Sequence, residues 1–160
     1  MKDTTNLTGK IAPAFKAPVI GGGYEEGAIV SLADLKGQTV VLYFYPKDDT
    51  PGCTAQACAL RDGWSRIQKK AAIFGVSVDP LKSHVKFIQK HSLPFPLISD
   101  EAKEIVQAYG VWVEKSMYGK KYMGTERGTV IIGPDGKVKA VLRKVQPAEH
   151  LDLVLNALSQ

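Results

Sequence analysis

Two cysteines five positions apart are the residues of this sequence best suited to chemistry. Cys53 and Cys58 are the only cysteines among the 160 residues, and Cys53 follows an apolar run over 40–45 that is typical of a buried strand. The residues after Cys53 favour helix, so this cysteine is expected to open a helix just beyond the strand. A helix start offers unpaired backbone N–H groups and a positive dipole end, which favour a thiolate over a thiol. We therefore expect Cys53 to act as a nucleophile.

Three residues close to Cys53 could shape a small pocket around its sulfur. Pro46 fixes the backbone at the turn that follows the strand. The hydroxyl of Thr50 could donate a hydrogen bond to the thiolate or to an incoming oxygen. Gly52 leaves room for the backbone to approach a small ligand. Together these residues predict a pocket for a small, polarisable oxidant.

Cys58 lies where an intact helix would keep it away from Cys53. The Cα atoms of residues i and i+5 in an α-helix are ~8.7 Å apart, whereas a disulfide needs less than about 7 Å. A bond between the two cysteines therefore requires the start of the helix to unwind. We expect Gly63 to lie inside this helix and to favour unwinding, because glycine costs a helix ~1 kcal/mol relative to alanine.

The rest of the sequence supplies the elements that must position these cysteines. The N-terminal residues 1–10 are expected to form a loose leader, followed by an extended stretch and the flexible glycines at 21–23. Patterns of apolar and capping residues predict a helical turn at 31–37, strands at 40–45, 72–78 and 97–99, and helices from 53 to about 70, over 81–90 and over 100–109. The remaining residues predict a polar loop at 114–126, a hairpin of 129–132 with 138–142, and a C-terminal helix from Pro147.

This order of elements predicts an α/β protein with a central mixed β-sheet flanked by helices on both faces. The strands at 40–45 and 72–78 are expected to be parallel neighbours, joined through the cysteine helix. That arrangement is a thioredoxin-like fold. A chain of 160 residues without repeats or linkers suits one domain, residues 1–160.

Composition and charge exclude several classes of protein. With 44% hydrophobic and 23% charged residues, the chain is typical of globular proteins, and no run approaches the ~20 apolar residues of a membrane span. The N-terminus lacks the apolar core of a signal peptide, so we expect a cytoplasmic protein with reduced thiols. A net charge of +5 does not argue for nucleic acid. Two cysteines without nearby paired ligands do not predict a metal site.

The motif around Cys53 resembles that of the peroxiredoxins, Pro-x-x-x-Thr-x-x-Cys at positions 46–53. A second cysteine five residues later is similar to the bacterioferritin comigratory protein or peroxiredoxin Q subgroup. The segments 111–115, 117–124 and 126–129 also resemble that subgroup, and the resemblance covers roughly residues 10–155.

The resemblance implies a thioredoxin-like fold and the reduction of hydrogen peroxide and organic hydroperoxides by Cys53. It makes Cys58 the resolving cysteine, thioredoxin the usual reductant and a monomer the expected state, without a metal, flavin or haem. It also implies that Pro46, Thr50 and Arg127 complete the peroxide site. Arg127 suits this role chemically, because a fixed cation can stabilise the thiolate and bind peroxide oxygens.

Simpler readings of the same residues stay open. Cys58 could serve only in packing, which would leave a one-cysteine mechanism, and Arg127 could be an ordinary surface ion-pair partner. Two other functions use the same fold or cysteine: a thiol–disulfide oxidoreductase, and a redox sensor or holdase that reacts only once. The histidines at 84, 91 and 150 are expected to face packing or solvent, and the tryptophans at 64 and 112 to lie in the core.

Overall fold

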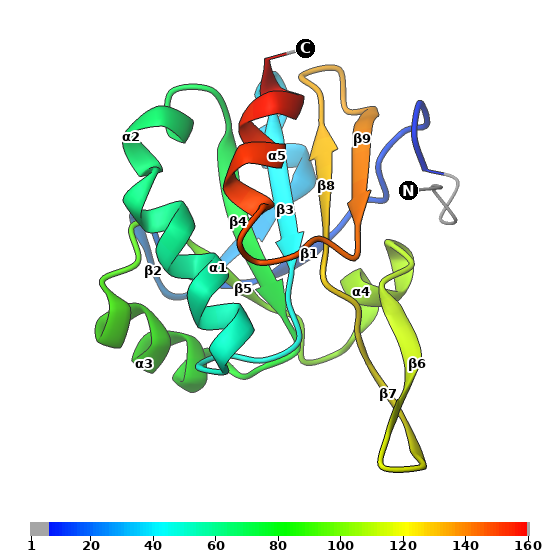
Figure 1. Ribbon diagram of the computed structural model, residues 1–160. Coiled ribbons are helices and arrows are strands. Elements are labelled where there is room, and N and C mark those ends of the chain that lie inside the picture. Colours follow the sequence, from blue (N-terminus) through cyan, green and yellow to red (C-terminus); the bar gives the residue numbers. More distant parts are fainter. Residues whose placement is uncertain (1–6, 160) are drawn as a thin grey trace.

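A seven-stranded mixed sheet forms the centre of the protein, with the strand order β2-β1-β5-β4-β3-β8-β9 (Figure 1). The computed structural model describes residues 7–159. The strands of this sheet are β1 (Lys16–Gly21), β2 (Tyr24–Ser31), β3 (Val40–Phe44), β4 (Ala72–Ser77), β5 (Leu97–Ser99), β8 (Gly128–Ile132) and β9 (Val138–Arg143). The predicted strands at 40–45, 72–78 and 97–99 and the predicted hairpin are thus confirmed, with ends that differ by a residue or so.

Strand β3 is an interior strand of the sheet, between β4 and β8, and determines where the cysteines are placed. It pairs in parallel with β4, as predicted, and antiparallel with β8. All five of its residues are buried, because helices cover both faces of this strand. The chain leaves β3 at the carboxyl edge of the sheet and enters α1 (Pro51–Asp62), which connects β3 to β4. The start of α1 therefore lies beside the end of a rigid central strand.

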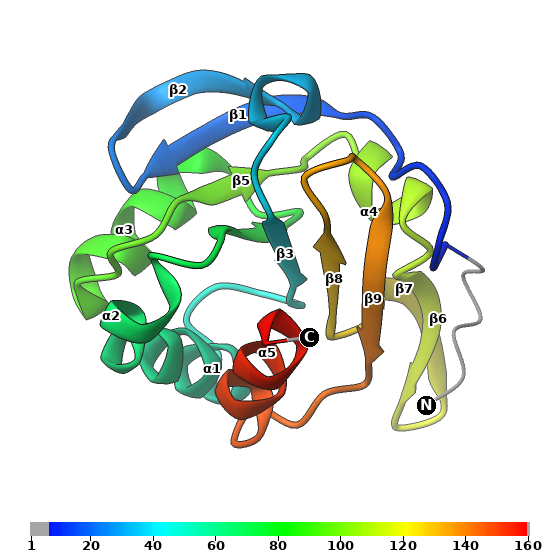
Figure 2. The same ribbon diagram turned by 90° about the horizontal axis from the view of Figure 1, so that it is seen from above.

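Helices cover both faces of the sheet, which confirms the predicted thioredoxin-like architecture (Figure 2). Successive residues of β3 point to opposite faces, so Val41 and Tyr43 join one core cluster and Leu42 and Phe44 join the other. The first cluster includes side chains of α1, α3 (Leu81–His91) and α5 (His150–Leu158). The second includes side chains of α4 (Glu104–Ala108) and of the 3-10 helix Leu32–Leu35, which Ser31 caps as predicted.

The predicted polar loop at 114–126 is wrong, because these residues form a separate hairpin. Strands β6 (Trp112–Met117) and β7 (Lys120–Thr125) pair antiparallel and project from the body of the protein (Figure 1). The turn between them places Tyr118 and Gly119 at positive φ, 53° and 79°, which is the geometry of a two-residue hairpin turn. Most side chains of both strands are exposed, so the apolar alternation that normally marks a strand is absent.

A second hairpin was also missing from the prediction. The glycines at 21–23 all have positive φ and form the turn between β1 and β2, rather than a flexible stretch. The strand β2 is mostly exposed at the edge of the sheet, and its sequence, with Glu25, Glu26 and Gly27, carries no clear strand signal.

Three predicted helices have different limits in the structure. The cysteine helix ends at Asp62, and a separate short helix, α2 (Trp64–Ile67), follows Gly63. Gly63 therefore lies at the end of α1 and not inside a helix, which corrects the prediction. Asp100 does cap its helix, with a carboxylate that accepts from the backbone N–H of Glu104 and of Val106, but α4 begins only at Glu104. The last helix begins at His150 rather than at Pro147.

The predicted loose leader is corrected where the structure describes it. Gly9 donates a backbone hydrogen bond to Val138, and Val138 donates one to Lys10, so this segment is attached to the start of β9. The rest of the predicted leader, residues 1–6, lies outside the described residues. Within residues 7–159, no helix has the length and apolar character that a membrane crossing requires.

Candidate active site

Cys53 lies in the first turn of α1, two residues after Pro51 begins the helix. Thr50 is the N-cap residue, in an extended conformation, and its carbonyl accepts the first helical hydrogen bond from Thr54 at 2.8 Å. The side chain of Cys53 is almost completely buried and belongs to the core cluster between α1 and the sheet. The predicted position at the start of a helix is therefore confirmed, although the helix begins two residues earlier than expected. The thiol is therefore shielded from open solvent.

Arg127 brings a cation to this thiol from a distant part of the chain. Its Nη2 atom lies 3.5 Å from Cys53 Sγ, within hydrogen-bond distance for sulfur. Arg127 stands between β7 and β8, so the sheet carries its guanidinium to the start of α1. A guanidinium in this place can stabilise a thiolate and can also donate to the oxygens of a bound peroxide. The alternative of an ordinary surface ion pair does not describe this contact.

Gln56 is a residue of this site that the sequence analysis missed. It is completely buried on α1, and its Oε1 accepts a hydrogen bond from Arg127 Nη1 at 2.6 Å. Gln56 follows Cys53 by three positions, so both side chains lie on the same face of the helix. The spacing of three residues could have indicated that Gln56 lies near Cys53. Its role becomes visible only from its hydrogen bond to Arg127.

Thr50 and Gly52 belong, with Cys53, to the start of α1, but the hydroxyl of Thr50 is engaged elsewhere. Thr50 Oγ1 donates to the carbonyl of Lys47 at 2.8 Å, so the predicted donation to the thiolate is not made in this structure. The lone pairs of that oxygen are left to accept a hydrogen bond from a ligand. At Gly52, an added Cβ would lie 3.0 Å from Arg127 Nη2 and 3.6 Å from Pro147 Cγ. Glycine at this position therefore leaves room for the guanidinium. Pro46 lies half-buried in the loop between β3 and α1.

Cys58 lies on the same intact helix as Cys53, and both cysteines are free thiols. Cys58 is half-buried, whereas Cys53 is buried. This arrangement agrees with the expectation that a folded α1 holds the two sulfurs apart. Arg61, one turn beyond Cys58, donates to the carbonyl of His91 at 2.8 Å and attaches the second half of α1 to the end of α3. A rearrangement that brings the cysteines together must therefore involve the first turns of α1.

The histidines do not gather into a metal site. His84 and His150 are completely buried, so packing and not solvent surrounds them, whereas His91 is half-buried and contacts Asp49. His150 bonds Thr129 Oγ1 at 2.7 Å, and burial, with a smaller effect of the Arg127 charge, lowers its pKa to about 4. Among residues 7–159, no three His, Cys, Asp or Glu side chains are grouped so that they could hold a metal ion.

The expectation that both tryptophans lie in the core needs adjustment. Trp64 and Trp112 are only half-buried, and each packs against the margin of a core cluster instead of lying within it.

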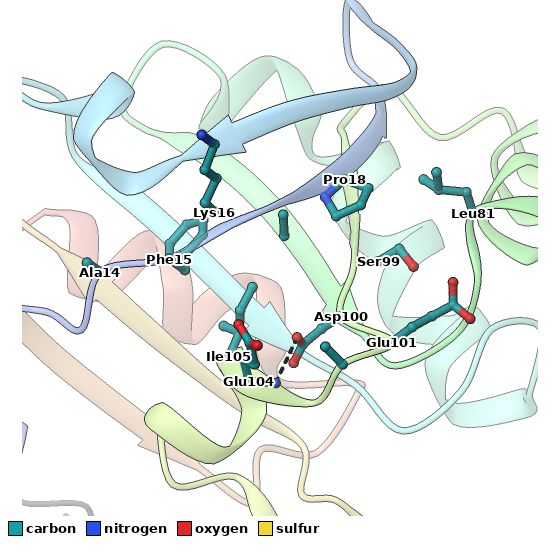
Figure 3. A pocket seen from close by; sticks show the side chains of 12 residues that line it. Ala14, Phe15, Lys16, Pro18, Leu81, Ser99, Asp100, Glu101, Glu104 and Ile105 are labelled. Atoms are coloured by element: carbon teal, nitrogen blue, oxygen red, sulfur yellow. Dashed lines mark hydrogen bonds between the residues drawn. The ribbon is translucent and has the colours of Figure 1, made fainter.

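A cavity of about 290 Å³ at the junction of β1, β5 and α4 is drawn in Figure 3, with Asp100, Glu101 and Glu104 among its lining residues. Burial raises the pKa of Asp100. This cavity contains none of the predicted site residues, so the thiol site is separate from it.

Comparisons with known proteins agree with this geometry. A sequence model of the AhpC/TSA family matches residues 8–141. A putative peroxiredoxin bcp of Coxiella burnetii is 47% identical over 144 residues, which are 89% of this chain and 95% of that protein. Peroxiredoxin Bcp of Escherichia coli is 41% identical over 153 residues, or 95% of each chain.

Solved structures show the same similarity in three dimensions. A structure of peroxiredoxin Q from Xanthomonas campestris matches this fold with a TM-score of 0.82 at 40% sequence identity, covering 91% of this chain and 89% of that one. Family, curated relatives and solved structure all point to the group that the motif at 46–53 resembles. The chain therefore belongs to the AhpC/TSA family, as a peroxiredoxin of the Bcp or peroxiredoxin Q group, and is a thiol-dependent peroxidase.

Proposed function

We propose that this peroxidase reduces hydrogen peroxide and organic hydroperoxides through a sulfenic acid on Cys53. The thiolate attacks the terminal oxygen of the hydroperoxide, the O–O bond breaks, and water or an alcohol leaves after taking up a proton. The sulfur is oxidised by two electrons and the peroxide is reduced by two. A structure of the Xanthomonas campestris relative is described in connection with its alkyl peroxide reduction activity, which supports organic hydroperoxides as substrates here.

Arg127 is the residue that gives this proposal its strongest support. Its guanidinium reaches Cys53 Sγ at 3.5 Å while Gln56 holds its other nitrogen. In the proposed step it stabilises the thiolate and then the charge that develops on the leaving oxygen. Thr50 positions the hydroperoxide by accepting a hydrogen bond from its O–H group, and Pro46 and Gly52 shape the walls of the pocket.

Cys58 is proposed to complete the reaction within the same chain. The first turns of α1 unwind, the Cys58 sulfur attacks the Cys53 sulfenic acid, and water leaves as the disulfide forms. A dithiol reductant such as thioredoxin then restores both thiols by exchange. Because both cysteines belong to one chain, the cycle needs no second subunit, and this fits a monomer. A compartment that supplies reduced dithiols, such as the cytoplasm, suits the cycle.

Steady-state peroxide consumption with thioredoxin, thioredoxin reductase and NADPH tests the proposal. The wild type should turn over, Cys53→Ser should be inactive, and Cys58→Ser should lose most of its turnover. Full activity in Cys58→Ser would limit Cys58 to packing and indicate a one-cysteine mechanism. A single peroxide-consuming event without turnover, with several dithiol reductants tried, would favour a redox sensor over an enzyme.

A further inference from the structure

The loop between β3 and α1 carries a buried aspartate that the peroxide chemistry described above does not use. Asp48 lies two residues before Thr50 and is only 6% exposed. Its Oδ1 accepts from the hydroxyl of Tyr45 at 2.5 Å, and its Oδ2 accepts from the hydroxyl of Ser83 at 2.8 Å. The same Oδ2 lies 2.6 Å from Nδ1 of His84. The carboxylate thus has three hydrogen-bonding partners, one just after the end of β3 and two on α3.

Both ring nitrogens of His84 contact oxygen atoms of the protein. Its other ring nitrogen, Nε2, lies 3.0 Å from the carbonyl oxygen of Ile98 on β5. A carbonyl oxygen can only accept, and the carboxylate of Asp48, which already receives two hydroxyl donors, also accepts. We infer that both ring nitrogens carry a proton, so that His84 is an imidazolium paired with the Asp48 carboxylate, and the nitrogen NMR experiment below distinguishes this from a proton held on Asp48. The histidine is completely buried, which makes this a desolvated ion pair.

This ion pair connects the loop to three other parts of the fold. Through His84 it reaches α3 and β5, and the backbone N–H of Asp48 donates to the carboxylate of Asp79, just after β4, at 2.9 Å. Thr50 is linked to the same point, because its hydroxyl donates to the carbonyl of Lys47, the residue immediately before Asp48. The position of the Thr50 oxygen therefore depends on where Asp48 is held.

We propose that Asp48 is a positioning residue for the peroxide reaction, and that its ion pair with His84 holds the loop 46–50 in the geometry that receives the hydroperoxide. The inference rests on the proposed function, since it concerns the rate at which Cys53 reacts. The pair holds the loop in place while the first turns of α1 unwind and refold. Asp48 contributes to the oxidation of Cys53 and not to the later formation of the disulfide.

The chain offers a matched control in the neighbouring residue. Asp49 belongs to the same loop and has the same charge, but it is exposed and contacts Lys90 and His91 at the end of α3. Asp48→Asn and Asp49→Asn can be compared in a Cys58→Ser background, where only the first step occurs. The rate constant for oxidation of Cys53 by hydrogen peroxide is measured by rapid quench, trapping the sulfenic acid with dimedone.

Asp48→Asn should react about tenfold to a hundredfold more slowly, because small displacements of positioning groups have effects of that size, and Asp49→Asn should stay within about twofold of the parent. With Cys58 present, disulfide formation should proceed at the same rate in Asp48→Asn and wild type. An unchanged oxidation rate in folded Asp48→Asn, or an equal loss in Asp49→Asn, would overturn the proposal. A purely structural role would lower the stability to urea and leave the rate of the folded protein intact, which also counts against it.

Two further measurements keep the proposal testable if Asp48→Asn does not fold. Ser83→Ala removes one hydrogen-bond donor to Asp48 without changing the charge of either partner. It should slow Cys53 oxidation about fivefold, as expected for one hydrogen bond of ordinary strength. An unchanged rate would contradict the proposal. Nitrogen NMR of the histidine rings in the reduced wild type should show both nitrogens of His84 protonated at neutral pH, and a neutral ring would overturn it. Failure of the wild type to oxidise Cys53 would instead refute the proposed function, because the NMR result needs no peroxide.

Discussion

Gln56 holds the guanidinium of Arg127 against Cys53. The amide oxygen accepts from Arg127 Nη1 at 2.6 Å, and the same guanidinium extends Nη2 to Cys53 Sγ at 3.5 Å. Gln56 is completely buried, and its Nε2 has no hydrogen-bond partner among residues 7–159. The side chain therefore leaves one donor unsatisfied while it aims its acceptor at the arginine. A residue of α1 therefore orients a cation that comes from a distant part of the sequence.

Replacement of Gln56 by leucine should slow the reaction of Cys53 with hydroperoxide about tenfold to a hundredfold, because a hydrogen bond to a charged group contributes about 1.5–3 kcal/mol. Gln56→Glu should retain most of the activity, since a carboxylate can accept the same bond. The measurement is kcat/KM for hydrogen peroxide in both variants. Equal activity in Gln56→Leu and wild type would show that Arg127 needs no such support.

Arg127→Lys should lower the same kcat/KM by about tenfold to a hundredfold although the charge is kept. A planar guanidinium offers separate donors to Gln56 and Cys53, whereas a lysine ammonium is a single point charge that cannot hold both contacts in the same geometry. Arg66→Lys, at an exposed position on α2, serves as the control and should behave as wild type. Wild-type activity in Arg127→Lys would mean that charge alone is required.

The site could be predicted from the sequence where its signals are local. Cys53 was placed correctly because an apolar run, a proline-rich turn and a helix-forming segment follow one another within 25 residues. The contact of Arg127 with Cys53 spans 74 positions, so only resemblance to a known family suggested it. Gln56 was missed for the same reason, because its role depends on that distant arginine.

The fold followed the same rule. Strands β3 and β4 were predictable because they are buried on both faces and read as continuous apolar runs. The hairpin β6–β7 and the strand β2 were not, because their side chains are largely exposed and their turns rely on residues with positive φ. Asp48 and His84 gave no sequence signal, since their pairing is visible only when α3 packs beside the loop.

The structure indicates that Gly63 is required for packing, whereas the sequence suggested that it eases the unwinding of α1. A Cβ at this position would lie 2.8 Å from both terminal carbons of Leu151 on α5. We expect Gly63→Ala to lower the free energy of unfolding by about 1 kcal/mol, the lower end of overpacking costs, because the end of the leucine can partly move aside. Urea unfolding measures this change.

A double-mutant cycle with Leu151→Ala separates packing from helix flexibility. The penalty of Gly63→Ala should disappear when Leu151 is already truncated, because the clash is then gone. If Gly63 acts by easing the unwinding of α1 instead, Gly63→Ala should slow disulfide formation after oxidation whichever residue stands at 151. A penalty that persists in the Leu151→Ala background would contradict the packing explanation.

His150 should make the fold sensitive to acid. Burial, with Arg127 as a smaller cause, lowers the pKa of His150 to about 4 in the folded protein, whereas a free histidine has a pKa of about 6.5. Between these values the unfolded chain binds the proton more readily than the folded one, so stability is present above about pH 6.5 and is lost as the pH falls toward about 4. From pH 7.5 to pH 5 the loss should be about 2 kcal/mol, by linkage between these two values.

Urea unfolding of wild type, His150→Gln and His91→Gln at several pH values isolates this contribution. Glutamine at 150 does not titrate and can still bond Thr129, so His150→Gln should lose about 2 kcal/mol less than wild type between pH 7.5 and pH 5. His91→Gln, at the half-buried histidine beside Asp49, controls for the loss of a histidine outside the core. If the His150→Gln and wild-type curves fall in parallel, acid acts through the carboxylates of the protein and His150 is not the group that senses it.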